Sequence, residues 1–200
     1  MSQSALSAVQ FLLGTLLDLY AMIVALRFVM QSVRADYYNP IAQFIVTATD
    51  PLLRPLRRVI PSLGRYDTAS LVLCLVVLFV KFALFKALGL GIVNELGGLV
   101  NVAAMGLPTL FAAALVNLVH LFFNIMIFAL IVQALLSWLP DGGRSPIAGL
   151  LQSITMPVLA PIRRFVPPMG GLDLSTLVAI IGLFAVQKFV VGTLAAVLLA

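Results

Sequence analysis

The amino-acid sequence predicts an all-α, polytopic membrane protein made of two tandem helical hairpins in parallel orientation. Hydrophobic residues make up 62% of the chain and charged residues 10%, and the mean hydropathy is +1.17, a balance far outside that of soluble domains. Apolar runs long enough to cross a bilayer core, about 20 residues, occur at residues 8–31, 68–92, 113–138 and 174–199. An internal repeat groups these runs into two pairs.

The internal repeat is clearest in the segment between the two apolar runs of each pair. Residues 50–72 recur without a gap as residues 156–178, an offset of 106 residues, with ten identities in 23 positions. Chance does not account for this likeness, so the chain is predicted to be two copies of one unit. The first repeat is predicted at residues 1–93, with its basic loop at residues 32–67. An outer-face connector follows at residues 94–112. The second repeat covers residues 113–200, with its basic loop at residues 139–173.

Prolines, a glycine and an aspartate recur at matched positions in the two basic loops. The dipeptides Asn39-Pro40 and Asp50-Pro51 are each predicted to begin a short helix, which lies at the membrane surface because one side is apolar and the other basic. A further proline ends the second helix, the glycine supplies a turn, and the aspartate caps the next membrane helix. The motif residues are Pro51, Pro55, Pro61, Gly64 and Asp67 in the first repeat and Pro157, Pro161, Pro167, Gly170 and Asp173 in the second.

Arginines share one face of the predicted motif helix. Arg54, Arg57 and Arg58 lie at spacings of three and four, and Arg163 and Arg164 match the last two in the second repeat. Three interpretations stay open: the arginines only set the membrane topology, they bind anionic lipid headgroups, or they bind another protein. Direct binding of nucleic acid is not expected, because the arginines lie beside apolar runs.

Lysine and arginine are unevenly distributed among the segments between the apolar runs. Residues 32–67 hold five, residues 139–173 hold three and residues 93–112 hold none, so both basic loops are predicted to face the cytoplasm and both chain ends the outer side. Residues 96–116 are apolar, but a fifth span there would put the basic loops on opposite sides. They are interpreted as an outer-face loop or as a re-entrant or interfacial segment.

Polar residues inside the apolar runs lie at matching depths. Counted from the cytoplasmic ends of their helices, Asp18 and Lys81 are level, and the repeat offset maps them onto Asn124 and Gln187. An intramembrane charge costs a few kcal/mol and usually faces a partner, so each pair is predicted to lock its hairpin. An ion or proton pathway is the alternative. Lys188 lies close to the depth of Asn124.

Motifs of catalysis and cofactor binding do not occur in the sequence. There is no phosphate-binding glycine loop, no HExxH zinc motif and no GxSxG nucleophile elbow. The one cysteine, Cys74, lies in an apolar run and belongs to no spaced Cys/His set. We therefore expect neither an enzyme nor a cofactor, and no metal site.

The doubled motif resembles the YggT family of small bacterial membrane proteins, which includes the YlmG-type proteins of Gram-positive bacteria and plastids. The resemblance spans nearly the whole chain. It rests on the arginine pair, on a Gly-x-x-Asp sequence and on a hydroxyl residue three positions after that aspartate, all present in both copies. Two positions depart between the repeats: Asp50 is replaced by Met156, and Arg27 by Gln133.

The resemblance implies a place in the bacterial inner membrane and a role in osmotic or envelope stress tolerance, in division or nucleoid organisation, or, in plastids, in cytochrome assembly. It implies no catalytic mechanism. We therefore expect a non-enzymatic scaffold or assembly factor whose basic loops contact lipid headgroups or a larger membrane complex, or which self-associates. The alternative is a small channel or transporter component, which would place the intramembrane polar residues along one wet cavity instead of in dry pairs.

Overall fold

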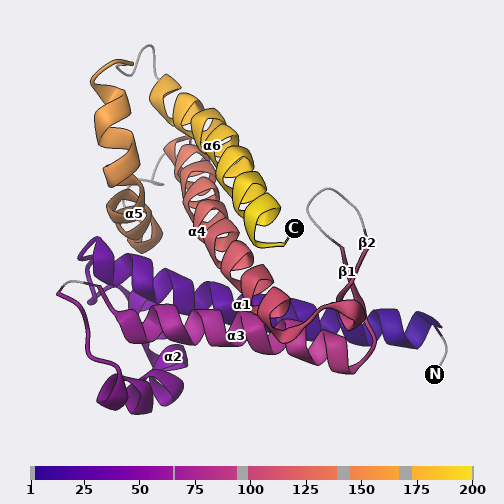
Figure 1. Cartoon of the computed structure of the whole chain (residues 1–200). Helices are drawn as coiled ribbons and strands as arrows, with labels where there is room; N and C mark the ends of the chain where they lie inside the picture. The colour runs from indigo at the N-terminus through magenta and orange to yellow at the C-terminus, as the bar shows by residue number, and fades with distance from the viewer. Residues whose placement is uncertain (1–2, 65, 94–98, 139–144, 167–172, 200) are drawn as a thin grey trace.

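The computed structural model describes residues 3–64, 66–93, 99–138, 145–166 and 173–199. These residues form six helices and a small strand hairpin (Figure 1). The helices are α1 (Gln3–Ser32), α2 (Pro40–Val59), α3 (Thr68–Ala87), α4 (Leu107–Ser137), α5 (Pro146–Arg163) and α6 (Leu174–Leu198). The hairpin pairs β1 (Gly91–Val93) antiparallel with β2 (Leu99–Asn101), and the 3-10 turn η1 (Val102–Ala104) follows.

Among the described residues, α1, α3, α4 and α6 are long and apolar enough to cross a membrane. The predicted all-α fold with paired membrane helices is therefore confirmed, and the chain is a membrane protein. Three predicted ends were wrong. α1 begins at Gln3 instead of residue 8. α3 stops at Ala87 instead of residue 92, because Gly89 adopts a left-handed φ of 65° that ends the helix. α4 begins at Leu107 instead of residue 113, because Pro108 fits the first turn of a helix.

The apolar stretch between the repeats holds no fifth spanning helix among its described residues. Residues 99–104 form β2 and η1, and residues from 107 onward belong to α4. Residues 94–98 lie outside the described part of the chain. The strand hairpin lies at the end of the first repeat opposite α2 (Figure 1), so the described part of this stretch is a connector followed by the start of α4.

α2 and α5, which carry the proline and arginine motif and are called the motif helices, are longer than the sequence predicted. α2 runs unbroken through Pro51 and Pro55, and α5 runs through Pro157 and Pro161, so the prediction of a second helix start at Asp50 was wrong. A proline inside a helix removes one backbone hydrogen bond and bends the helix, and both helices change direction along their length (Figure 1). At a surface the released carbonyl can be hydrated, so these prolines bend the helices without ending them.

The beginnings of the two motif helices follow the repeat. Asn39 caps α2, because its side-chain oxygen accepts a hydrogen bond from the backbone N–H of Ile41 at 2.9 Å. At the matched position, the Ser145 side chain accepts from the backbone N–H of Ala148 at 3.2 Å and caps α5. Pro61 lies just beyond the last turn of α2. The predicted cap at Asn39 is therefore confirmed, and the second repeat achieves the same start with a serine.

Each repeat is a hairpin of two membrane helices with the motif helix at one end. α1 packs along α3, α4 packs along α6, and the hairpins meet through α3 and α4 (Figure 1). Small side chains let α1 and α3 approach closely: Ala21 and Ala25 are fully buried, and the thiol of Cys74 donates to the Ala21 carbonyl at 3.5 Å. α2 and α5 lie together, and the Asn39 amide donates to the Pro146 carbonyl at 2.5 Å.

Both motif helices are expected to face the cytoplasm, because the basic residues gather at their end of the hairpins. In a chain whose Cys74 is replaced by alanine, we expect a cysteine at Ser62 or Gln152 to react with a membrane-impermeant maleimide only after the cells are opened. A cysteine at Leu107, which is exposed at the other end, should react in intact cells. Labelling of only one of the two motif-helix positions in intact cells would show that the repeats have opposite orientations.

Candidate functional site

An arginine–aspartate ion pair ties each motif helix to the membrane helix that follows it. In the first repeat, the guanidinium group of Arg57 donates to the Asp67 carboxylate, and the Ser70 hydroxyl donates to the same oxygen. In the second, Arg163 donates to Asp173 at 2.7 Å. The first arginine of each Arg-Arg pair therefore faces the protein, and its charge is matched by a carboxylate.

The aspartates predicted to cap the second membrane helix of each repeat stand at its start, but only Asp173 caps the helix through its side chain. Gly64 has a φ of 62°, the left-handed region that glycine adopts readily, and Asp67 and Asp173 occupy the N-cap positions of α3 and α6. The Asp173 carboxylate accepts hydrogen bonds from the backbone N–H of Thr176 at 3.3 Å and from its hydroxyl at 2.9 Å. Two further predicted motif residues lie outside the described part of the chain, Pro167 and Gly170.

Both aspartates stay ionised far below neutral pH. Burial alone would raise the pKa of Asp67, but hydrogen bonds from Arg57 and from a serine of α3 outweigh burial and hold the pKa below its usual value. For Asp173, burial is likewise outweighed by hydrogen bonds from Ser175 and Arg163, which lower the pKa to about 2. Each motif helix is thus held by a fully charged pair at neutral pH.

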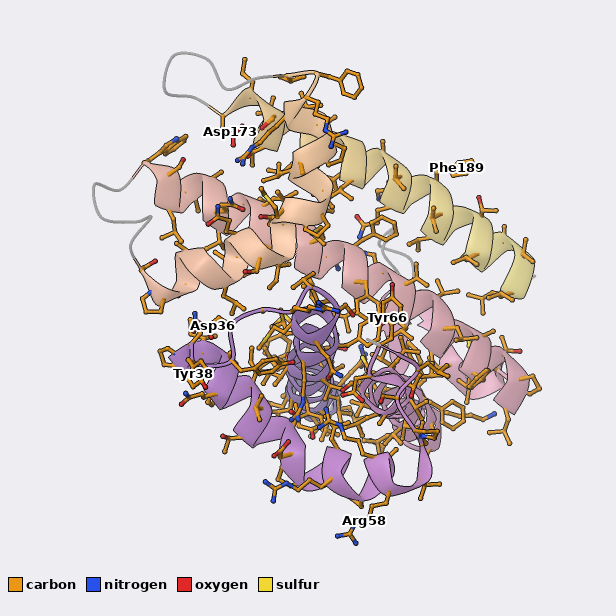
Figure 2. The ribbon with its side chains drawn as sticks, turned by 90° about the vertical axis from the view of Figure 1, so that its left-hand side faces the viewer. Asp36, Tyr38, Arg58, Tyr66, Asp173 and Phe189 are labelled. Carbon is orange, nitrogen blue, oxygen red and sulfur yellow. The ribbon has the colours of Figure 1, made fainter. Side chains whose placement is uncertain are left out.

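The second arginine of each pair points away from the protein. Arg58 projects outward from α2 in Figure 2, and neither Arg58 nor Arg164 forms an ion pair with a residue that the structure describes. Each precedes a large apolar side chain that is almost fully exposed: Val59 is 82% exposed and Phe165 is 86% exposed. The repeat therefore places an unmatched positive charge beside an exposed apolar side chain twice.

A further ion pair, between Arg27 of α1 and Asp50 of α2, anchors the first motif helix from inside. Arg27 is 4% exposed; its Nη1 lies 2.6 Å from the Asp50 carboxylate and donates to the Thr49 hydroxyl at 2.6 Å and to the Val46 carbonyl at 2.9 Å. Arg54 approaches Asp50 to 3.0 Å from the exposed side. Burial would raise the pKa of Asp50, but the two arginines outweigh burial and lower it.

This inner ion pair is absent from the second repeat because both partners are replaced together. Gln133 stands at the position of Arg27 and Met156 at that of Asp50, and the Thr155 hydroxyl donates to the side-chain oxygen of Gln133. Each replacement is visible in the sequence, but sequence reasoning missed that the two side chains touch. The sequence did hold a signal of this contact: the second repeat lacks both the cation and the anion that the first repeat has at these two positions.

The polar residues inside the membrane helices are brought together as two pairs, one in each hairpin. The Nζ of Lys81 lies 2.7 and 2.8 Å from the two carboxylate oxygens of Asp18, and the Gln187 amide donates to the side-chain oxygen of Asn124 at 2.7 Å. The Lys81 side chain is 10% exposed and that of Asp18 is 49% exposed. Lys188 joins neither pair: it is exposed on α6 and forms no ion pair with a described residue.

A small cavity lies beside the arginine–aspartate pair in each repeat. In the second repeat, a cavity of about 240 Å³ lies among α4, α5 and α6, next to Arg163 and Asp173. The cavity of the first repeat, about 260 Å³, is lined by Gln31, Arg57, Ile60, Ser62 and Asp67.

In the part of the chain that the structure describes, no group of three or more His, Cys, Asp or Glu side chains could hold a metal ion.

Lowering the pH from 3.8 to about 2 is expected to break the Arg163–Asp173 pair. The folded-state pKa of Asp173 is lowered from 3.8 to about 2, so its stabilising contribution is complete above the unfolded value and is lost as the pH falls through the folded value. Trp138, the one tryptophan of the chain, lines the adjacent cavity, so its fluorescence should follow the loss. Asp173→Asn should show the low-pH spectrum at pH 7; an acid transition unchanged in this variant would contradict the assignment.

Comparison with known proteins supports the repeat and the family resemblance. The family model described as CCB3/YggT matches residues 6–88 and again residues 112–194, two ranges that differ by the same offset as the motif. The uncharacterized protein PA0392 of Pseudomonas aeruginosa is 42% identical over 191 residues, which cover 95% of this chain and 91% of that protein. YggT of Escherichia coli K12 is 36% identical over 192 residues, 96% of this chain and 93% of its own. No solved structure matches the chain. The chain therefore belongs to the CCB3/YggT family, and its two repeats are the two stretches that the family model matches.

Proposed function

We propose that the protein is a non-enzymatic scaffold or assembly factor of the bacterial inner membrane, acting in stress tolerance, whose motif helices form a basic cytoplasmic contact surface. This proposal rests on the different positions of the two arginines in each pair. Arg57 and Arg163 are matched by carboxylates, whereas Arg58 and Arg164 face outward. The two helices are joined at their beginnings by a hydrogen bond, and each presents the same charge pattern at its other end.

The surface suits contact with a membrane or a membrane complex better than chemistry. An arginine next to an exposed apolar side chain is typical of a segment at the lipid interface, where the charge meets headgroups and the apolar group meets acyl chains. Each arginine near an anionic surface contributes about 1 kcal/mol, so Arg58 and Arg164 together contribute about 2 kcal/mol. The membrane helices already anchor the chain, so this modest attraction orients the surface and recruits neighbours.

A channel or transporter component is the second candidate, and the intramembrane residues argue against it. A pore would line one wet cavity with these side chains, whereas Asp18 pairs with Lys81 and Asn124 with Gln187 in separate hairpins. None of these residues lines either of the two cavities described above. Side chains that pair within one hairpin support a structural role for the residues.

Photo-crosslinking from the exposed apolar positions tests the proposed surface. A crosslinking amino acid replaces Val59 or Phe165 in living cells, and the captured lipids and proteins are identified by mass spectrometry. We expect both positions to capture the same anionic lipids or the same membrane protein, and the double variant Arg58→Glu with Arg164→Glu to reduce capture several-fold. Thr47, also exposed on α2, is the control position. Equal capture at Thr47, unaffected by the arginine changes, would overturn the proposal.

A further inference from the structure

The cavity of the second repeat lies where the ends of three helices converge. It has a volume of about 240 Å³, below the roughly 300 Å³ at which pockets for whole small molecules begin, so it holds part of a larger molecule. Its walls come from the ends of α4 and α5 and from the beginning of α6. The lining residues are Gln133, Ala134, Ser137, Trp138, Arg163, Asp173, Leu174, Thr176, Leu177 and Ile180.

The internal repeat explains why this cavity has an apolar end. The cavity beside the matching ion pair of the first repeat has a similar volume, about 260 Å³, but Ile60 is its only apolar lining residue, and neither Arg27 nor Phe28 lines it. Arg27 is bound to α2, and the Phe28 ring packs against Tyr66 at 6.2 Å and against Phe122 at 5.4 Å between ring centres. The second repeat has a glutamine and Ala134 instead. With these smaller side chains, the second cavity reaches the apolar residues at the beginning of α6, whereas the first cavity does not reach the matching part of α3.

The lining changes from polar to apolar along the cavity. The polar end holds Arg163 and Asp173, and the apolar end holds Leu174, Leu177 and Ile180. Leu174 and Leu177 are also exposed on α6, a membrane-crossing helix, so the apolar end opens toward lipid chains. A polar head and an apolar tail in one molecule would satisfy both ends, and this is the chemistry of a phospholipid.

The charge around the polar end favours an anionic lipid. The charge of Arg163 is matched by Asp173, but the neighbouring Arg164 is exposed and forms no ion pair with a described residue. The local balance is therefore positive, which attracts a lipid with a net negative headgroup more than a zwitterionic one. Trp138 is exposed at the end of α4, where tryptophan commonly marks the boundary between headgroups and acyl chains.

We propose that this cavity binds one anionic phospholipid of the leaflet that faces the motif helices. The phosphate lies at Arg163 and Arg164, and one acyl chain lies along Leu174, Leu177 and Ile180. The proposal deepens the proposed function and rests on it for the identity of the membrane surface. It also separates the repeats: the second cavity has an apolar end for an acyl chain, whereas the lining of the first cavity is almost entirely polar.

Native mass spectrometry of the full chain in phosphatidylglycerol nanodiscs, released into mild detergent, tests the site. We expect the wild-type protein to retain one phosphatidylglycerol molecule. Ala134→Phe installs the side chain of the first repeat and should reduce retention at least about tenfold, equivalent to about 1.4 kcal/mol of binding. Ala185→Phe adds the same side chain to the exposed surface of α6 and should retain the lipid. Equal retention by all three proteins would overturn the proposal.

A second variant keeps the test decisive if Ala134→Phe does not fold. Arg164→Gln removes an exposed charge that has no described ion-pair partner, so folding should be unaffected. In nanodiscs of equal parts phosphatidylglycerol and phosphatidylcholine, the wild type should retain mostly phosphatidylglycerol and Arg164→Gln should lose that preference. An unchanged preference would show that the arginine does not recognise the headgroup. Capture from Val59, which lies in the first repeat and does not depend on Arg164, is measured separately, so loss of the lipid site and loss of the contact surface are distinguishable.

Discussion

Replacing Asp18 by asparagine alone is expected to lower the free energy of unfolding by about 3–5 kcal/mol, because the charge of Lys81 is then buried without a counter-charge. Lys81→Gln should cost less, about 2.5–3.5 kcal/mol for an unpaired carboxylate near the centre of a membrane helix, because the Asp18 side chain is half exposed. The measurement is the unfolding free energy of each purified variant in bicelles, together with its folded yield in the membrane.

The double variant Asp18→Asn with Lys81→Gln should recover most of the lost stability. It recreates the Asn124–Gln187 pair, which the second hairpin already uses at the same depth. Gln187→Ala is the matched control: it breaks a neutral hydrogen bond between membrane helices, which contributes about 0.6 kcal/mol on average. If the single and double variants are all as stable as the wild type, the two charges do not interact in the membrane.

The same variants separate a scaffold from a channel. In a scaffold the Asp18–Lys81 pair serves only to hold α1 against α3, so the double variant should fold and support growth under osmotic stress. In a channel that conducts through this pair, the double variant would fold and yet lose ion-dependent growth rescue. Stability and growth therefore give independent answers for one pair of residues.

The paired residues in the membrane were predictable because the repeat offers two versions of one hairpin. Lipid requires a helix of a certain length, so hydropathy located the spans, and counting along them placed Asp18 level with Lys81. The simultaneous change to Asn124 and Gln187 then indicated contact. This reasoning needs only the spacing along straight antiparallel helices, a quantity that the sequence contains.

The orientation of the motif helices was not predictable in the same way. Spacing puts Arg54, Arg57 and Arg58 on one face, but which arginine faces inward depends on how α2 is rotated about its axis. That rotation is set by carboxylates elsewhere in the chain, Asp50 at the inner side and Asp67 at the start of α3. The cavity was also not predictable, because tertiary packing decides which side chains of α4, α5 and α6 line it.

Replacing Asp50 by methionine is expected to be more damaging than replacing its partner Arg27 by glutamine. Asp50→Met leaves a guanidinium group that is 4% exposed with only neutral acceptors, Thr49 and Val46, so the free energy of unfolding should fall by about 3–5 kcal/mol. Arg27→Gln leaves Asp50 with Arg54, so it should cost only the charged hydrogen bonds, about 1.5–3 kcal/mol.

The double variant Arg27→Gln with Asp50→Met should be more stable than Asp50→Met alone, because it installs the combination that the second repeat already holds. There the Thr155 hydroxyl donates to Gln133, and Thr49 is placed to make the same bond to the new glutamine. Arg54→Gln is the control: its side chain is 77% exposed, so losing it should change stability by less than about 1 kcal/mol. Thermal unfolding in detergent gives the order. If the double variant is no more stable than Asp50→Met, the residues of the second repeat cannot replace the Arg27–Asp50 pair in the first. The paired replacement would then reflect a difference in what the two motif helices do.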